Sequence, residues 1–460
     1  MAKKEKVAVG NEPIYDAKQL GVPKMLILGF QHTFAMFGAT VLVPLLTGLD
    51  IATTLLMAGL GTLFFHLVTK GKVPAFLGSS FAFLGGYAAV TNYTNEAGET
   101  LIDKSMLPYA CLGVAVAGLV YLVLAVLFAI FDSAKIMKYF PPVVTGPIII
   151  AIGLGLAGSA VSNCETNWLL AFIALATVII FNIWGKGMSK IVPILLGIIV
   201  SCVVAVIMHN VGDTPVFDAG KIQALKDAAW IGFPIQKEGI VFGNVPDKSK
   251  IISAIIAIVP ISLATMMEHI GDISAISATT GRNFLADPGL KKTLVGDGLA
   301  TSFSALFGGP ANTTYGENTG VLALTKVYDP KVVRIAALVA ILLSFSPKVA
   351  ALINLIPTAV IGGISFVLYG MISAIGVRNV VENKVDFTKS RNLIVAAVIL
   401  VAALGMSGGI SFNIGSAAIS LSGLAVASIA GILLNAILPG KDYVFKAEEY
   451  DNAKKSKGDK

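Results

Sequence analysis

The chain has 460 residues, of which 55% are hydrophobic and only 13% are charged. Its mean hydropathy of +0.82 excludes an ordinary soluble domain, in which about 25% of the residues are charged. The net charge of +7 comes from basic residues spread over loops and tails, so it does not indicate nucleic-acid binding, and the three cysteines predict neither a disulfide framework nor a metal site.

Apolar runs that could cross a bilayer as helices recur along the whole sequence. The polar start of the chain is expected to be a tail and not a cleaved signal peptide. We expect fourteen spans, which would make an all-α polytopic membrane protein. They lie near residues 26–48, 52–69, 76–90, 107–131, 143–161, 168–184, 190–209, 251–275, 293–307, 310–325, 332–346, 357–377, 391–406 and 414–437.

Lysine and arginine set the predicted orientation, because they are enriched in cytoplasmic loops. With the N-terminus in the cytoplasm, most of the 34 basic residues fall on the cytoplasmic side. Most exceptions lie in the long polar loop at 210–250, where the rule is weakest. An even number of spans also returns the C-terminus to the cytoplasm. We therefore expect a multi-pass protein of the plasma membrane with both termini inside.

Two spans, the third (76–90) and the tenth (310–325), are short and interrupted by glycine, proline and small polar residues. Each is third in its group of seven, as expected for two inverted repeats, and paired interrupted spans are typical of a transporter's binding site. In both we expect a short extended piece followed by a half-helix, which in the tenth span begins at Gly316. The N-terminus of a half-helix presents free N–H groups and partial positive charge to a ligand.

Four acidic residues lie well inside the apolar runs: Glu268, Asp272, Asp297 and Glu317. A charged side chain in lipid costs roughly 2.5–3.5 kcal/mol on insertion scales, so these four should face the protein interior. Glu268 and Asp272 share one face of a helix, and their mutual repulsion favours a proton on one of them. We expect Asp297 to be an inward polar anchor and His269 a packing or hydrogen-bonding residue, and no metal site is predicted.

The expected site would offer two backbone donors, two carboxylate acceptors and the aromatic face of Phe81. A flat ring with N–H donors and carbonyl acceptors matches this set. Uracil has these groups, and xanthine has them together with further hydrogen-bonding groups on its larger ring. An anion fits poorly beside two acids unless they are protonated. We therefore expect a neutral planar nucleobase as substrate, a carboxylate as the proton-coupling group, and no cofactor beyond the proton gradient.

The run Glu317-Asn318-Thr319-Gly320-VLAL-Thr325-Lys326 matches the whole signature of the nucleobase–ascorbate transporter family. From about residue 25 to 437 the chain resembles this family, and within it the bacterial uracil permeases. Four further segments carry the likeness: QHTFAMFGATVLVPLL (31–46), PAFLGSSFAF (74–83), EHIG (268–271) and NTTYGENTG (312–320).

The resemblance implies two domains, short antiparallel strands in spans 3 and 10, a homodimer in the lipid bilayer, and uracil import with protons. The two domains implied are a core domain (25–131 and 251–352) and a gate domain (140–210 and 353–438). A cytoplasmic tail (1–24), an extracellular loop (211–250) and a second cytoplasmic tail (439–460) make up the rest of the chain.

The family's binding positions fall on specific residues here. Those implied to bind substrate are Ala39, Phe81, Glu268, Gly316 and Glu317, with Tyr315 beside them and His32 at a polar position of the first span. The proton-coupling candidates are Glu268, Asp272 and Asp297. One departure matters, because the uracil permeases read E-H-I-G-H where this chain reads E-H-I-G-D. Asp272 thus replaces a histidine that is thought to hold the first carboxylate.

Three alternatives stay open. The first is a xanthine or urate symporter on the same fold, although purine carriers of the family tend to have glutamine at the position of Glu317. The second is an anion exchanger or channel, against which the paired acids count. The third is a membrane enzyme, for which the sequence offers no nucleophile–base pair.

Overall fold

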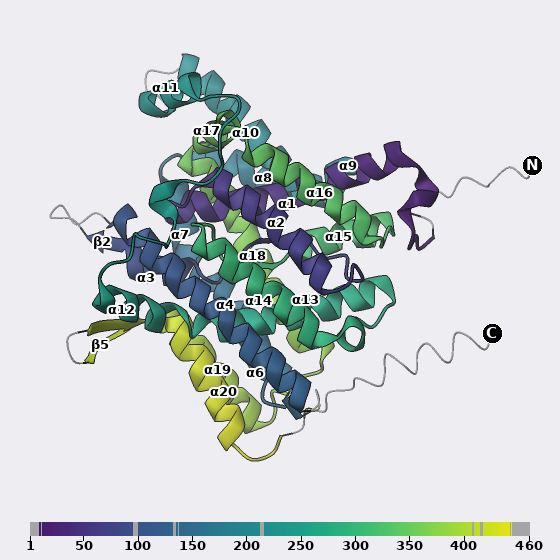
Figure 1. The fold of residues 1–460 in the computed structure, drawn as a ribbon, viewed down its shortest axis with the longest axis vertical. Coiled ribbons are helices and arrows are strands. Elements are labelled where there is room, and N and C mark those ends of the chain that lie inside the picture. The colour runs from purple at the N-terminus through teal and green to yellow at the C-terminus, as the bar shows by residue number, and fades with distance from the viewer. Residues whose placement is uncertain are drawn as a thin grey trace, which may run out of the picture.

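The computed structural model describes residues 9–10, 12–94, 100–131, 135–136, 138–211, 216–406, 409–414, 417–441 and 443. The protein is mostly helical, as predicted (Figure 1). The first part contains η1 (Ala17–Leu20), α1 (Val22–Thr47), α2 (Ile51–Val68), β1 (Leu77–Ser79), α3 (Leu84–Thr91), β2 (Asn92–Thr94), β3 (Thr100–Ile102), η2 (Lys104–Met106), α4 (Leu107–Ile130), α6 (Pro142–Gly155), α7 (Ala157–Glu165), α8 (Trp168–Trp184), α9 (Met188–Ile191) and α10 (Pro193–Val211).

The second part begins with the polar loop, in which α11 and η3 lie. It contains α11 (Ala219–Asp227), η3 (Lys237–Gly239), α12 (Lys248–Ile258), α13 (Ile261–Thr280), η4 (Leu285–Gly289), α14 (Leu290–Leu306), β4 (Asn312–Thr314), α15 (Gly316–Thr325), α16 (Pro330–Ser344), α17 (Pro347–Asn354), α18 (Thr358–Glu382), α19 (Ser390–Gly405), β5 (Ile410–Ile414), β6 (Ala417–Leu421) and α20 (Gly423–Ile437).

Several helices are long and apolar enough to cross a membrane. Within the described ranges there are seven such stretches, and the pair α16 and α17, bent by 89°, would add an eighth. Helices α8, α19 and α20 are apolar but shorter. A multi-pass membrane protein is therefore confirmed, whereas the count of fourteen spans stays a prediction.

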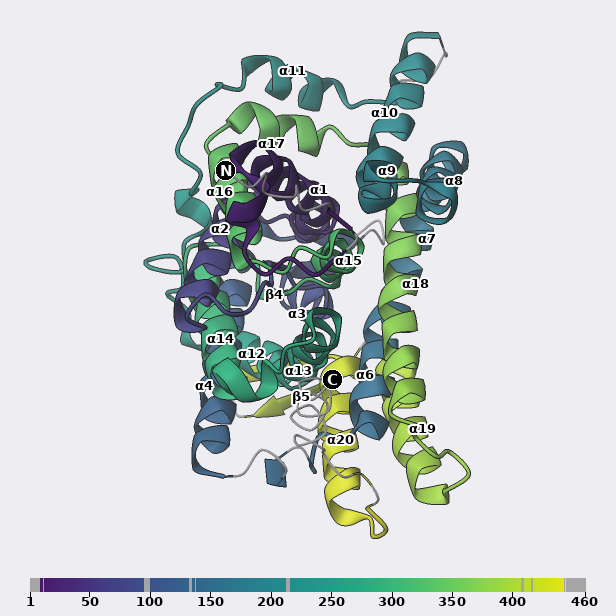
Figure 2. The same cartoon turned by 90° about the vertical axis from the view of Figure 1, so that its right-hand side faces the viewer.

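The helices form two groups that face each other (Figure 2). In the first group, α4 packs on α14, and α2 packs on both α14 and α16. In the second, α18 packs on α6, α7 and α8, while α10 packs on α8. Between them lie α13 and α15 (Figure 2), so elements that carry the predicted site sit where the groups meet.

Close helix packing in the first group depends on small residues. A Cβ atom on Gly118 of α4 would lie 2.6 Å from the carbonyl oxygen of Gly298 on α14, and one on Gly298 would lie 2.6 Å from the carbonyl oxygen of Gly118. Without side chains at this crossing, the two backbones approach closely, as at many helix interfaces in membranes. The crossing fixes α14, which in turn supports β4.

The predicted strands in the two interrupted spans are confirmed. Strands β1 and β4 pair antiparallel, with Gly78 opposite Thr313 at the centre and Leu77–Thr314 and Ser79–Asn312 on either side. Two further antiparallel pairs, β2 with β3 and β5 with β6, were not predicted.

Lys326 ends α15 in the left-handed conformation, with φ 53° and ψ 23°. This conformation costs an L-residue about 1–2 kcal/mol, whereas the freedom of glycine in the unfolded chain costs about 0.5–1 kcal/mol. Lys326→Gly is therefore expected to raise the free energy of unfolding by about 0.5–1 kcal/mol, measured by thermal unfolding in detergent. The control Ala323→Gly, inside the same helix, should lower it by about 1 kcal/mol, and an equal loss in both variants would contradict this account.

Candidate functional site

The two interrupted spans meet at the strand pair β1·β4, where α3 follows β1 at one end and α15 follows β4 at the other. The ladder continues on both sides of it, since the Tyr315 N–H donates to the Phe76 carbonyl (3.0 Å) and the Ser80 N–H donates to the Ala311 carbonyl (2.9 Å). Helix α15 then begins at Gly316, the residue predicted from the sequence. The first N–H groups of a helix have no acceptor within that helix, so the exposed Gly316 presents donors at the meeting point.

Tyr315 fixes this crossing. Its ring lies against Gly78, its hydroxyl donates to the Ser79 carbonyl at 3.1 Å, and the Thr40 hydroxyl donates to it at 3.3 Å. These contacts join β1, α1 and the start of α15. The hydroxyl of Tyr315 is thus occupied by protein groups, and a role of Tyr315 in binding substrate stays a prediction.

Gly78 leaves the room that the Tyr315 ring occupies, because a Cβ atom at position 78 would overlap that ring. Overpacking of this kind typically costs about 1–3 kcal/mol. We expect Gly78→Ala to separate the strands and abolish substrate binding in a binding assay on purified protein. The control Gly85→Ala adds a methyl group to α3 in open space and should bind normally, and wild-type binding by Gly78→Ala would overturn the assignment.

Helix α13 carries two of the predicted acids on the face toward β4. The Thr314 hydroxyl of β4 donates to Oδ2 of Asp272 at 2.6 Å. Glu268 is half-buried, and its Oε2 atom is shielded from solvent and has no hydrogen-bond partner among the described residues. Oε2 of Glu268 is thus an acceptor for which the described part of the chain supplies no donor.

Glu317 lies in the first turn of α15 and is half-buried. Glu268 interacts electrostatically with Glu317 as well as with Asp272 and Asp297. The structure therefore brings the four predicted acids into one region, although they come from three different helices.

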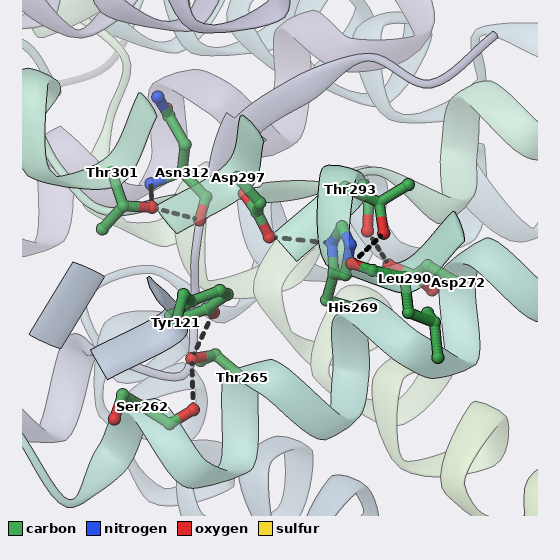
Figure 3. A network of polar contacts seen from close by, with 11 residues as sticks. Tyr121, Ser262, Thr265, His269, Asp272, Leu290, Thr293, Asp297, Thr301 and Asn312 are labelled. Carbon is green, nitrogen blue, oxygen red and sulfur yellow. Dashed lines mark hydrogen bonds and ion pairs between the residues drawn. The ribbon is translucent and has the colours of Figure 1, made fainter. Parts of the chain in front are cut away.

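Asp297 and His269 form a separate, fully buried pair (Figure 3). Oδ2 of Asp297 on α14 lies 2.8 Å from Nδ1 of His269 on α13, and both side chains are 0% exposed. The edge of the Phe65 ring packs nearby, with ring centroids 6.3 Å apart. The pair ties α13 to α14, as expected for an inward anchor, and a proton-coupling role of Asp297 stays a prediction.

Three hydroxyl groups complete this polar layer (Figure 3). Tyr121 donates to Oγ1 of Thr265 on α13 at 2.6 Å, and Thr265 donates to the Ser262 carbonyl at 3.1 Å. Thr301 of α14 donates to the Asn312 carbonyl at 3.0 Å and accepts from the Asn312 N–H at 3.2 Å. The Tyr121 bond ties α13 to α4, and the Thr301–Asn312 bonds hold β4 against α14.

Phe81 and Ala39 occupy buried positions beside the crossing. Ala39 of α1 is 0% exposed, and Phe81, between β1 and α3, is 8% exposed. The Phe81 ring makes an edge-on contact with Tyr369 of α18, with centroids 5.9 Å apart. Phe81 thus meets the second group of helices, a contact that sequence reasoning missed.

His32 and Asn318 fix the position of α15. The Asn318 side-chain nitrogen lies 3.1 Å from both Nδ1 and the carbonyl oxygen of His32, which is buried in α1. Sequence reasoning flagged both residues separately, but only the structure joins them. Asn318 follows Glu317 directly, so this contact sets the direction from which Glu317 enters the site.

Comparisons with known proteins show the family to which this chain belongs. The family model Xan_ur_permease, described as "Permease family", matches residues 23–412. The "Uracil permease" of Bacillus caldolyticus is 40% identical over 441 residues, covering 94% of this chain and 96% of the relative. The "Uracil permease" of Bacillus subtilis (strain 168) is 39% identical over 422 residues, covering 89% and 91%.

A solved structure shares the fold at lower sequence identity. The transmembrane domain of the cyanobacterium bicarbonate transporter BicA is 17% identical, covers 91% of this chain and 99% of that chain, and gives a TM-score of 0.58. The relatives that cover most of this chain, at about 40% identity, are named permeases. The protein is therefore a transporter and not an enzyme. The chain therefore belongs to the nucleobase–ascorbate transporter family of membrane permeases.

Proposed function

We propose that this protein imports uracil by proton symport across the plasma membrane. The observation that carries the proposal is Glu317 in the first turn of α15, next to the exposed Gly316 and within electrostatic range of Glu268. Two carboxylate acceptors and a row of backbone donors complement the N–H and carbonyl groups of a pyrimidinedione ring. The names of the relatives from the two Bacillus species support the same substrate.

In the proposed complex, Glu317 and Glu268 accept hydrogen bonds from the ring N–H groups. The N–H groups of Gly316 and Phe81 donate to the ring carbonyls, and the Phe81 side chain packs against the ring. Ala39 leaves room on the side of α1. Hydrogen bonds to a charged acceptor are about twice as strong as neutral ones, so the carboxylates would dominate the affinity.

Glu268 is the proposed proton carrier, because its shielded Oε2 has no hydrogen-bond partner among the described residues. Asp272 lies one helical turn further along α13, toward the predicted cytoplasmic side, and would relay the proton to water. The bond from Thr314 to Asp272 connects this relay to β4. Protonation of Asp272 would thus affect the strand that positions Gly316.

Alternating access would come from movement of the two helix groups against each other. We assign residues 25–131 and 251–352 to a core domain and residues 140–210 and 353–438 to a gate domain. The half-helices α3 and α15 would carry the substrate with the core. We further propose a homodimer with both termini in the cytoplasm, and fourteen spans as two inverted repeats of seven.

Asp272 offers a test of the proton relay. Asp272→Asn keeps an oxygen acceptor for Thr314 but cannot take up a proton, so we expect normal uracil binding and a changed pH dependence of uptake. Asp272→His should be tolerated, since it restores the residue of the resembling permeases. Uptake of labelled uracil over a range of pH measures both, with Thr314→Val as the control that removes only the hydroxyl. An unchanged pH profile in Asp272→Asn would exclude Asp272 from the relay.

Competition during uptake tests the substrate itself. Labelled uracil is offered to proteoliposomes containing the purified protein, together with an excess of unlabelled uracil, xanthine or bicarbonate. The proposal predicts strong competition by uracil and little by the other two. Stronger competition by xanthine would favour the purine symporter, and inhibition by bicarbonate alone would favour an anion exchanger.

A further inference from the structure

A recess lies between the two helix groups, beside the proposed binding site. It has a volume of about 160 Å³. Its first wall comes from α1 and α15, including Phe34, Glu317 and Gly320. Its second wall comes from the end of α8, from α9 and from α18, through Asn182, Lys190 and Met371.

The recess extends from Glu317 toward the predicted cytoplasmic side. Helix α15 runs from Gly316 at the strand crossing to Thr325 near its cytoplasmic end. Asn182 lies near the end of α8, and Lys190 lies in the short helix α9 that leads to α10. This connection contains the basic loop GKGMSK (185–190), which the charge distribution assigns to the cytoplasm. A molecule leaving Glu317 for the cytoplasm would therefore enter this space.

The lining of the recess has the character of a small-molecule site. Such sites are mostly apolar with a few polar groups that converge on the ligand. Here the polar groups are Asn182, Lys190 and Glu317, and the remainder is apolar apart from glycine. Gly320 leaves further room, because a Cβ atom there would meet nothing within 4 Å. The volume is small compared with the roughly 300–1,000 Å³ of pockets for drug-sized ligands, so it suits a single ring.

We propose that this recess is a second nucleobase-binding station on the cytoplasmic release route. The inference rests on the proposed uracil transport and adds residues that the sequence did not indicate. Lys190 and the Asn182 amide donate hydrogen bonds to the ring carbonyls, while Glu317 still accepts from a ring N–H. Both donors belong to the gate side, so the ring passes from donors on the core to donors on the gate as it leaves.

Thiol labelling tests the location of the station. Asn182→Cys is made in a Cys202→Ser background, because Cys202 is partly exposed whereas Cys111 and Cys164 are buried. A membrane-impermeant thiol reagent should modify it in inside-out vesicles but not in right-side-out vesicles, and saturating uracil should slow the reaction. The control Lys186→Cys, an exposed position on the same connection that does not line the recess, should react without protection by uracil.

Transport kinetics test the role of Lys190. Lys190→Met should raise the half-saturating uracil concentration about tenfold when uracil is offered from the cytoplasmic face, the factor expected for loss of one charge-assisted hydrogen bond. The half-saturating concentration for uracil offered from the outer face should stay the same. The control Lys186→Met should leave the half-saturating concentration unchanged at both faces.

The outcomes separate the two proposals. If the parent protein moves no uracil, the proposed function fails. If it moves uracil but Asn182→Cys is unprotected or is modified from outside, the release station is wrong while the function stands. Equal kinetic changes at both faces in Lys190→Met would likewise overturn the station.

Discussion

Glu317→Ala is expected to abolish measurable uracil binding while the protein still folds. The residue stands in the first turn of α15, next to the exposed Gly316 and within electrostatic range of Glu268. Truncating a charged group that pairs with a buried polar partner costs about 2–5 kcal/mol, which would place the affinity beyond the range of calorimetry. Isothermal titration of purified protein with uracil measures this directly.

Two further variants serve as controls for Glu317→Ala. Glu382→Ala removes an exposed acid that pairs with Arg378 at 3.5 Å and lies outside the proposed site, so it should bind uracil like the parent protein. Glu317→Gln keeps the shape of the side chain but loses its charge, and we expect an intermediate loss. Unchanged binding by Glu317→Ala would remove this residue from the site, and with it the proposed orientation of the ring.

The second large effect concerns Glu268, whose neutral replacement should uncouple transport from the proton gradient. Glu268→Gln keeps a side-chain oxygen that can accept from the ring, but it cannot carry a proton. We therefore expect exchange of uracil between equal pools to continue at a reduced rate, while accumulation driven by a pH gradient is lost. Exchange and gradient-driven uptake are measured on the same proteoliposomes, so differences in reconstitution cancel.

The prediction would be contradicted if another acid carried the proton. If Glu268→Gln still concentrates uracil against its gradient, the proton travels through another acid. Asp272 would then be the first candidate, since Thr314 already holds it against β4. Asp297 would be the second, although it is fully buried against His269.

The local features of the site could be predicted because short-range chemistry determines them. Pro310 and the glycines around it disfavour a continuous helix, so the extended piece and the start of α15 at Gly316 follow from the sequence. The positions of Glu268 and Asp272 on one face follow from helical geometry. The buried placement of Asp297 follows from the cost of leaving a carboxylate in lipid.

The contacts between elements could not be predicted, because they join residues far apart in the chain. The bond from Thr314 to Asp272, the contact of Asn318 with His32 and the packing of Phe81 on Tyr369 all depend on how helices cross. The 89° bend between α16 and α17 was likewise missed. A hydropathy pattern reports which segments are apolar, but it does not report their bends or their neighbours.

The most direct test of the central claim is uptake of labelled uracil into proteoliposomes with and without an imposed pH gradient. The account predicts that an inward proton gradient drives accumulation above the external concentration, that a protonophore abolishes it, and that Glu317→Ala shows none. Uptake that only equilibrates uracil, unaffected by the gradient, would contradict proton symport. The absence of any uracil uptake, with strong uptake of xanthine or bicarbonate, would contradict the substrate.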